Sequence, residues 1–409
     1  MSGQGPLSDL TVVEMTAHRA GPFCGALLAD LGAEIVKIER PEVGDPARDQ
    51  GPGPAGKSGY FMANNRNKKS VTLDLKTEAG REAALELLAE ADVFVENFGY
   101  GVTEKLGIGY EDVCEVNEGV IYASIKGYGE TGPSKEKKGL DLILQAEGGI
   151  MSVTGPEGGH PVKVGQAIGD LGAGMFATIA ILARLHERDR RDGTRGTADG
   201  EFVGKFDIGL FDTIVSLMNE YLTFHSMTGE VPGPQGTSHQ SLVPYQLFET
   251  ADGHVVTGVP SDDRWDDFVD VVGREELRAY QTNDERVENE ETVVSMIQEE
   301  FSKRTTDHWL SELTEHGFPN GPLNDVADVV GHDQARARGL VRPHDDPDGG
   351  EVTLPGHPVN FPDFDTEIRR PAPRLGEHTD EVFADIADEQ TRLDEWRAGG
   401  AFGGSSDDE

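Results

Sequence analysis

The sequence has little cysteine, little lysine and no long apolar run, and each shortage excludes a class of protein. The two cysteines, Cys24 and Cys114, are too few for a disulfide framework or a multi-thiolate site, and they fit a reducing, cytoplasmic setting. The twelve histidines lack the spacing of metal ligands, so we expect no metal. No apolar run approaches about 18 residues, and the first ten residues lack the basic and apolar regions of a signal peptide. Neither a transmembrane helix nor a leader is predicted.

Positive charge is scarce: 36 Lys and Arg residues stand against 75 Asp and Glu, a formal net charge of −39 over 409 residues. Nucleic-acid phosphates and anionic lipid surfaces repel such a polyanion, so neither is an expected partner. Only 13 of the cations are lysines, and the carboxylates are spread along the chain. This composition is typical of proteins that work in concentrated salt, where ions screen the self-repulsion. We expect a halophilic protein rather than an ordinary acidic one.

Apolar patterning predicts an α/β fold with a Rossmann-like large domain. Strand-like runs alternate with segments of helical period, which is typical of a parallel sheet covered on both faces. The expected strands are 10–15, 35–39, 70–75, 93–98, 120–125 and 202–208. The expected helices of this part are 22–31, 77–91, 141–153, 174–188 and 209–224.

A smaller α+β domain is predicted at 229–325, with a hairpin over 245–258 and helical patterns from 262 to 317. The large domain then takes 1–225 and 340–398. The Pro/Gly-rich segments 226–241 and 319–345 are expected linkers, and 399–409 is an expected disordered tail. Further expected elements are a helix at 333–340, strand structure over 351–361 and a helix at 378–387.

Two apparent motifs indicate structure rather than chemistry. Residues 51–56 fit the dinucleotide pattern G-x-G-x-x-G, but they follow the nearest strand by twelve residues and their prolines do not open a helix. Cys24 lies on an apolar helix and is interpreted as a core residue rather than a nucleophile.

The segment 165–174 places one carboxylate, Asp170, among glycines just before an apolar helix. Glycines let a ligand approach the backbone, and amide groups at a helix start favour an anion or a developing oxyanion. A carboxylate held there can act as a nucleophile. The plainer alternative, that Asp170 is the N-cap of the helix, is favoured by this segment alone.

Several separated stretches resemble the class III CoA-transferases, the CaiB/BaiF-like or formyl-CoA-transferase family. They are 20–48 (AGPFCGALLADLGAEIVKIERPEVGDPAR), 66–81, 92–110, 124–133 (SIKGYGETGP), 141–155, Gly169-Asp170, 239–253 (HQSLVPYQLFETADG) and 369–382. The resemblance covers nearly the whole chain. It implies the fold described above, interlocked homodimers, and substrates that are acyl-CoA and small carboxylic acids, with no tightly bound cofactor beyond the CoA of the substrate.

The resemblance also implies roles for particular residues. Asp170 matches the catalytic aspartate, which is acylated and then carries CoA as a thioester. Asp141 lies where formyl-CoA transferase has a glutamate near the active site. The family's CoA contacts fall on His18, Arg19, Ala20, Arg40, Leu73, Lys76, Asn97, Phe98, Lys105 and Lys138. The neighbouring Lys135 and Lys137 could oppose CoA phosphates or lie on an exposed turn, and both alternatives stay open.

Departures from the family pattern narrow the function. Related racemases have a histidine where this chain has Leu140, and leucine cannot move a proton. The glycine-rich loop of formyl-CoA transferase has no counterpart at 258–262, which makes oxalate specificity doubtful. Arg19 could hold a dicarboxylate, or else a CoA phosphate or a surface carboxylate. We expect succinyl-CoA as donor and mesaconate or a similar C4–C5 diacid as acceptor; an acyl-CoA racemase and a non-catalytic CoA-binding protein are the alternatives.

Overall fold

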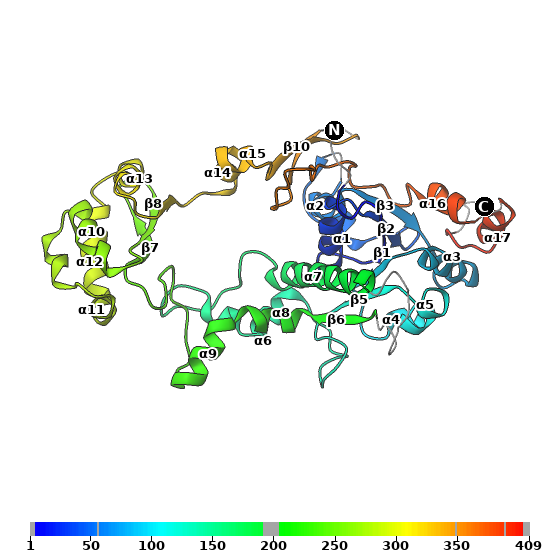
Figure 1. Ribbon diagram of the computed structural model, residues 1–409, viewed down its shortest axis with the longest axis horizontal. Coiled ribbons are helices and arrows are strands. Elements are labelled where there is room, and N and C mark those ends of the chain that lie inside the picture. Colours follow the sequence, from blue (N-terminus) through cyan, green and yellow to red (C-terminus); the bar gives the residue numbers. More distant parts are fainter. Residues whose placement is uncertain (1–4, 55–56, 191–203, 348–349, 388–389, 404–409) are drawn as a thin grey trace. The chain divides into compact units, whose positions relative to one another are not determined.

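The computed structural model describes residues 5–54, 57–190, 204–347, 350–387 and 390–403 (Figure 1). The chain forms two compact units. The larger comprises residues up to 150, 164–222 and 333 onward, and the smaller comprises 151–163 and 223–332.

A six-stranded sheet is the centre of the larger unit. Its strands are β1 (Thr11–Met15), β2 (Glu34–Glu39), β3 (Lys68–Thr72), β4 (Val93–Glu96), β5 (Ile121–Lys126) and β6 (Phe206–Gly209). All neighbours are parallel, in the order β3-β2-β1-β4-β5-β6. This is the order of doubly wound dinucleotide-binding folds, so the expected α/β class and parallel sheet are confirmed.

Both faces of the sheet are buried, as the continuous apolar runs predict. Val12 packs into one core and its neighbour Val13 into the other, because successive strand residues point to opposite faces. The first core includes the helices α1 (Ala20–Asp30) and α7 (Ile168–Arg190), with β6 leading into α8 (Leu210–Leu217). The second includes α3 (Glu78–Ala89), α5 (Tyr110–Val116), α16 (Thr379–Ile386) and α17 (Gln390–Ala398).

Other elements complete the larger unit. They are η1 (Pro46–Asp49), α2 (Gly59–Asn65), α4 (Val102–Lys105), α6 (Asp141–Glu147), α15 (Asp333–Ala337) and the antiparallel pair β10 (Val341–Asp345) and β11 (Glu351–Pro355). The helix α9 (Asn219–Thr228) begins in the larger unit and ends in the smaller.

Helix α7 is long and apolar enough to cross a membrane, judged by length and composition alone. Ala173, Ala177 and Ile181 are nevertheless fully buried, and they pack into the core that α1 shares with the sheet. A core helix satisfies the same two criteria. Cys24 is buried opposite, and burial raises the pKa of its thiol to about 12, which leaves it inert at neutral pH. The interpretation of Cys24 as a core residue is confirmed.

The smaller unit pairs a three-stranded sheet with helices. Its strands β7 (Tyr245–Glu249), β8 (His254–Gly258) and β9 (Asn320–Pro322) are antiparallel, and the first two form the predicted hairpin. The helical elements are η4 (Asp262–Arg264), α10 (Trp265–Val272), η5 (Glu275–Ala279), α11 (Asn283–Glu288), α12 (Glu290–Phe301), α13 (Thr306–Glu315) and α14 (Val326–Gly331).

Several predicted boundaries were wrong. The helix expected over 141–153 ends at Glu147 and is followed by η3 (Ile150–Val153), with Gly148 and Gly149 between them. In the expected linker 319–345, α15 lies within the helix predicted at 333–340, whereas β9, α14 and β10 were not predicted. Residues 151–163, assigned to the large domain, belong to the smaller unit. Residues 399–403 of the expected tail are ordered: Ala401 is fully buried, and its carbonyl accepts a hydrogen bond from the Asp74 amide (2.7 Å). Residues 404–409 lie outside the described residues.

Candidate active site

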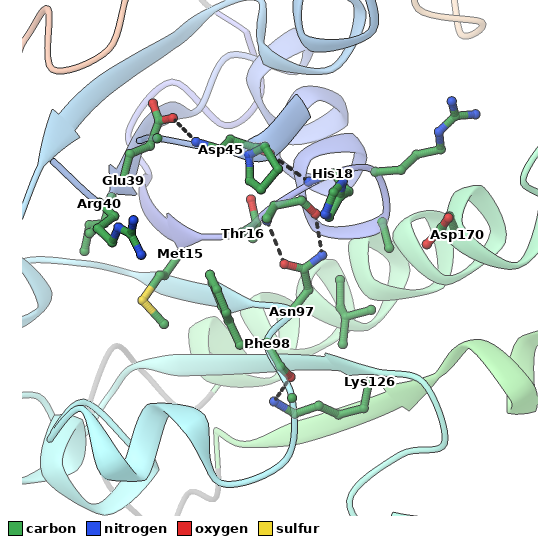
Figure 2. A pocket seen from close by; sticks show the side chains of 18 of the residues that line it. Met15, Thr16, His18, Glu39, Arg40, Asp45, Asn97, Phe98, Lys126 and Asp170 are labelled. Atoms are coloured by element: carbon green, nitrogen blue, oxygen red, sulfur yellow. Dashed lines mark hydrogen bonds between the residues drawn. The ribbon is translucent and has the colours of Figure 1, made fainter. Parts of the chain in front are cut away.

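A cavity of about 670 Å³ opens at the carboxyl ends of the parallel strands (Figure 2). Residues that end or directly follow all six strands line it, among them Met15, Glu39, Leu73, Asn97, Lys126 and Leu210. Strand order reverses between β1 and β4, and open α/β sheets bind ligands at this switch point. The topology therefore accounts for the position of the cavity.

Asp170 lies in the first turn of α7, with its side chain in the cavity (Figure 2). It is not the N-cap, because the helix begins at Ile168 and the Leu171 amide already donates to the Ala167 carbonyl. Among the described residues, no side chain or backbone amide donates a hydrogen bond to its carboxylate. Burial and the nearby charge of Asp141 raise the pKa of Asp170 to about 6, against the opposing effect of Arg19.

The glycines beside Asp170 serve helix packing. A Cβ atom at Gly174 would lie 2.7 Å from the Ala20 carbonyl oxygen, and one at Gly172 would lie 2.6 Å from the Thr213 methyl carbon. The interpretation that these two glycines admit a ligand was wrong. They let α7 approach α1 and α8 closely, which fixes the position of Asp170.

Asp141 caps the helix that carries Asp170. Its Oδ1 accepts a hydrogen bond from the Gly169 amide (2.8 Å), and its Oδ2 accepts one from the Gln145 amide group (2.7 Å). Gln145 also donates to the Gln166 carbonyl (3.3 Å). Asp141 is thus a positioning residue for the start of α7, and its negative charge acts on Asp170.

Arg19 lies at the N-terminus of α1 and also lines the cavity. Its Nε donates to the Tyr60 hydroxyl (3.1 Å), and one terminal nitrogen donates to the Gln166 side-chain oxygen (3.2 Å). The guanidinium stacks over the Tyr60 ring, 4.5 Å from its centroid. These contacts orient a cation whose charge lowers the pKa of Asp170.

The other cations of the cavity differ in exposure. His18, Arg40 and Lys76 are exposed and can meet the phosphates of a large ligand. Lys126 is buried and pairs with Glu96 (2.6 Å), and it donates to the Phe98 carbonyl (2.8 Å). Because these partners already occupy its ammonium group, Lys126 is a structural part of the cavity wall.

Comparison with known proteins identifies the family of the chain. The model of "CoA-transferase family III" matches residues 7–379. The chain is 35% identical over 390 residues to human succinyl-CoA:glutarate CoA-transferase, covering 94% of this chain and 87% of that protein. It is 37% identical over 390 residues to the succinyl-CoA:mesaconate CoA-transferase of Haloarcula hispanica, covering 93% and 96%.

The chain belongs to CoA-transferase family III. A crystal structure of a CAIB/BAIF family protein from Brucella suis superposes with a TM-score of 0.81 at 35% identity, covering 94% of this chain and all of that one. The resemblance in the sequence is thereby confirmed, and the chain is an enzyme of the CoA-transferase type.

The cavity brings together most of the residues that the family resemblance implied. Those lining it are His18, Arg19, Ala20, Arg40, Leu73, Lys76, Asn97, Phe98, Asp141 and Asp170. Lys105 and Lys138 are exposed and do not line it. Lys135 donates to the Tyr100 hydroxyl (3.1 Å) and Lys137 pairs with Glu147, as expected of an exposed turn. No group of three potential metal ligands occurs within the described ranges.

Sequence reasoning missed Tyr60, Gln166 and Lys126. Tyr60 lies on α2, a short helix for which no element was predicted. Gln166 is adjacent to the singled-out glycines, but its contact with Arg19 spans 147 residues and has no local signal. Lys126 could have been found, because it ends an apolar strand and polar residues at strand ends point to a site in parallel sheets.

Proposed function

We propose that the enzyme transfers CoA from succinyl-CoA to mesaconate or a similar C4–C5 dicarboxylate through a covalent intermediate on Asp170. The observation that carries the proposal is a carboxylate with a raised pKa that α7 presents to the cavity, where the charge of Arg19 acts on it. The relatives named for succinyl-CoA and for glutarate or mesaconate support the substrate class.

The reaction proceeds in two symmetrical halves. A carboxylate oxygen of Asp170 attacks the thioester carbonyl, the C–S bond breaks, and a mixed anhydride and CoA thiolate form. The thiolate attacks the Asp170 carbonyl, releasing succinate and leaving an aspartyl-CoA thioester. The acceptor carboxylate attacks this thioester and displaces the thiolate. The thiolate then attacks the acceptor carbonyl of the second anhydride, which releases the new acyl-CoA and regenerates Asp170.

Asp170 suits this chemistry because of its surroundings. Anhydride and thioester are both reactive acyl species, so neither traps the enzyme. Because no donor among the described residues occupies its oxygens, they are available to attack a substrate carbonyl. The raised pKa makes the carboxylate more basic than an exposed aspartate, and it is still ionised at neutral pH.

The pH dependence follows from the raised pKa. The attacking form is the carboxylate, so kcat/KM should fall about tenfold per pH unit below about pH 6 rather than below pH 4. Asp141→Asn should move this acid limb to lower pH, because the nearby negative charge is gone while an oxygen remains to cap Gly169. Initial rates over pH 4–8 in concentrated KCl measure the acid limb of the parent enzyme and that of the variant. A limb near pH 4 in the parent enzyme would contradict the assignment.

Arg19 is proposed to bind the second carboxylate of the diacid. Arg19→Gln should raise KM for a C4–C5 dicarboxylic acceptor roughly 10- to 100-fold, the usual effect of losing a charged hydrogen bond, and leave KM for a monocarboxylate nearly unchanged. Arg19→Lys is the matched control, since it keeps the charge but loses the planar fork. Equal losses for both acceptor classes would instead assign Arg19 to CoA.

We further propose a homodimer in the cytoplasm. On the larger unit, α7 exposes Met175, Phe176 and Ile179, and Leu140 and Leu142 are also exposed. Large exposed apolar side chains are unusual on so acidic a surface, and a second copy of the chain would cover them. Light scattering in concentrated KCl measures the mass, and a monomer would contradict this proposal.

The experiment that tests the function is an acceptor screen at multimolar KCl, with succinyl-CoA and acetyl-CoA as donors and products identified by mass. We expect transfer from succinyl-CoA to C4–C5 diacids. Exchange of the α-proton with deuterated solvent, in the absence of any acceptor acid, would support a racemase instead.

A further inference from the structure

The loop that carries Arg19 into the cavity is held by the side chain of Asn97. The Ala17 amide donates to the Asn97 side-chain oxygen (2.8 Å), and the Asn97 amide group donates back to the Ala17 carbonyl (2.8 Å) (Figure 2). This reciprocal pair joins the ends of β1 and β4 at the switch point of the sheet. Both polar atoms of the Asn97 side chain are therefore engaged within the protein.

The next residue of the loop is held from the other side. His18 adopts a left-handed backbone conformation (φ 62°), which is costly for a residue with a side chain. Its amide donates to Oδ1 of Asp45 (3.0 Å), the residue that caps η1 (Figure 2). The strained turn is thus fixed by two side chains from distant parts of the chain, and it directly precedes Arg19.

A buried charge network supports Asp45. Lys37 and Glu14 are fully buried; the Lys37 ammonium lies 3.2 Å from Asp45 and donates to the Thr16 carbonyl (2.7 Å). Glu14 also accepts two hydrogen bonds from Lys68. A Cβ atom at Gly25 would lie 2.0 Å from Glu14, so this glycine makes room for the pair. Buried charges contribute little net stability but hold a defined geometry.

We infer that Asn97 and Asp45 are positioning residues that fix the loop 16–19 so that Arg19 is held beside Asp170, and that the Asn97 side chain does not bind CoA. The inference rests on the proposed function, since it requires Asp170 as the reacting group. Two charges act on Asp170, those of Asp141 on α6 and of Arg19 at the start of α1. Tyr60 of α2 is a titratable neighbour whose own pKa the Asp170 charge raises. Of these, Arg19 depends on the loop.

The test is Asn97→Leu, which keeps the branched shape and the number of side-chain heavy atoms and removes both hydrogen bonds. With a looser loop, Arg19 spends less time beside Asp170, so the acid limb of the reaction should move to higher pH, toward its position in Arg19→Gln. The rate of acylation should fall on the order of 10- to 100-fold, the usual effect of a misplaced group, with little change in KM for succinyl-CoA. Single-turnover acylation of Asp170, trapped with hydroxylamine over pH 5–8, measures the limb and the rate.

A double variant separates positioning from direct binding. If Asn97 acts through Arg19, the limb in Asn97→Leu/Arg19→Gln coincides with that in Arg19→Gln alone. An unshifted limb in Asn97→Leu together with a raised KM for every acyl-CoA would overturn the inference and make Asn97 a CoA contact. Independent, additive shifts would overturn it as well.

Asn117→Ala is the matched control. The Asn117 amide also holds backbone carbonyls, those of Leu88 and Ala91, but the residue does not line the cavity. The Asn117→Ala substitution should lower thermal stability without moving the acid limb of the acylation reaction. Asn97→Ala repeats the test if the leucine variant unfolds. Absence of label on Asp170 in the parent enzyme refutes the proposed function, whereas a labelled parent with an unshifted Asn97→Leu refutes only this inference.

Discussion

Asp170→Ala should reduce CoA transfer by roughly four to six orders of magnitude, the loss expected when a covalent nucleophile is removed. Asp141 should not take over, because it already accepts hydrogen bonds from Gly169 and Gln145 at both oxygens. Binding of succinyl-CoA should persist, since the exposed cations of the cavity are unchanged. Product formation followed by mass in concentrated KCl measures the first effect, and isothermal titration measures the second.

Asp170→Asn is the control for folding, and its stability has a predicted sign. The pKa of Asp170 is raised to about 6 in the folded enzyme, so the folded state binds more protons than the unfolded state between about pH 4 and pH 6. The carboxylate therefore lowers stability as pH rises through this window. The neutral variant should unfold at a higher temperature than the parent above pH 6 and at a similar temperature below pH 4. An inactive variant that is also less stable at pH 7.5 would contradict this reading.

Removal of salt should unfold the enzyme. The formal net charge is −39, and repulsion among exposed carboxylates is screened over about 3 Å in 1 M salt but over about 10 Å in 0.1 M. Arg278 shows how the surface depends on screening, because Asp266, Asp270 and Glu275 all gather around its one charge. Dialysis from multimolar to 0.1 M KCl, followed by circular dichroism and activity, should show cooperative loss of both.

A charge variant distinguishes screening from other effects of salt. Asp9, Glu90 and Glu118 are exposed and far from the cavity lining, and replacing all three by lysine removes six units of negative charge. The variant should need less KCl to stay folded. Retention of structure and activity by the parent enzyme in 0.1 M KCl would contradict the halophilic proposal.

All six strands of the large sheet could be predicted, because each overlaps a short, largely apolar or alternating run bounded by turn residues or helical patterns. The parallel class followed from their alternation with helices. The order of the strands in the sheet could not be predicted, since it depends on where each crossover helix packs. Helix α2 has no long apolar stripe and gave no signal. Ala401 was assigned to a polar tail because its burial depends on contacts with residues far away in the sequence, such as Asp74.

The central residue of the candidate site could be predicted from the sequence, but the residues that hold the site in place could not. Asp170 stands out locally as a lone carboxylate at the start of an apolar helix. The helix is capped by Asp141, which lies 28 positions before the Gly169 amide that it binds, and the Asn97–Ala17 pair spans 80 positions. A single sequence carries no local pattern for such contacts. The glycines around Asp170 were recognised, but Gly172 and Gly174 are explained by the approach of α8 and α1 rather than of a ligand.

The central claim is tested most directly by trapping the enzyme during turnover. The enzyme is mixed with succinyl-CoA in concentrated KCl and treated with hydroxylamine, and its peptides are sequenced by mass spectrometry. The account predicts a hydroxamate on the side chain of Asp170, and none there in a sample without acyl-CoA. Steady transfer with an unmodified Asp170, or a hydroxamate on a different carboxylate, would contradict it.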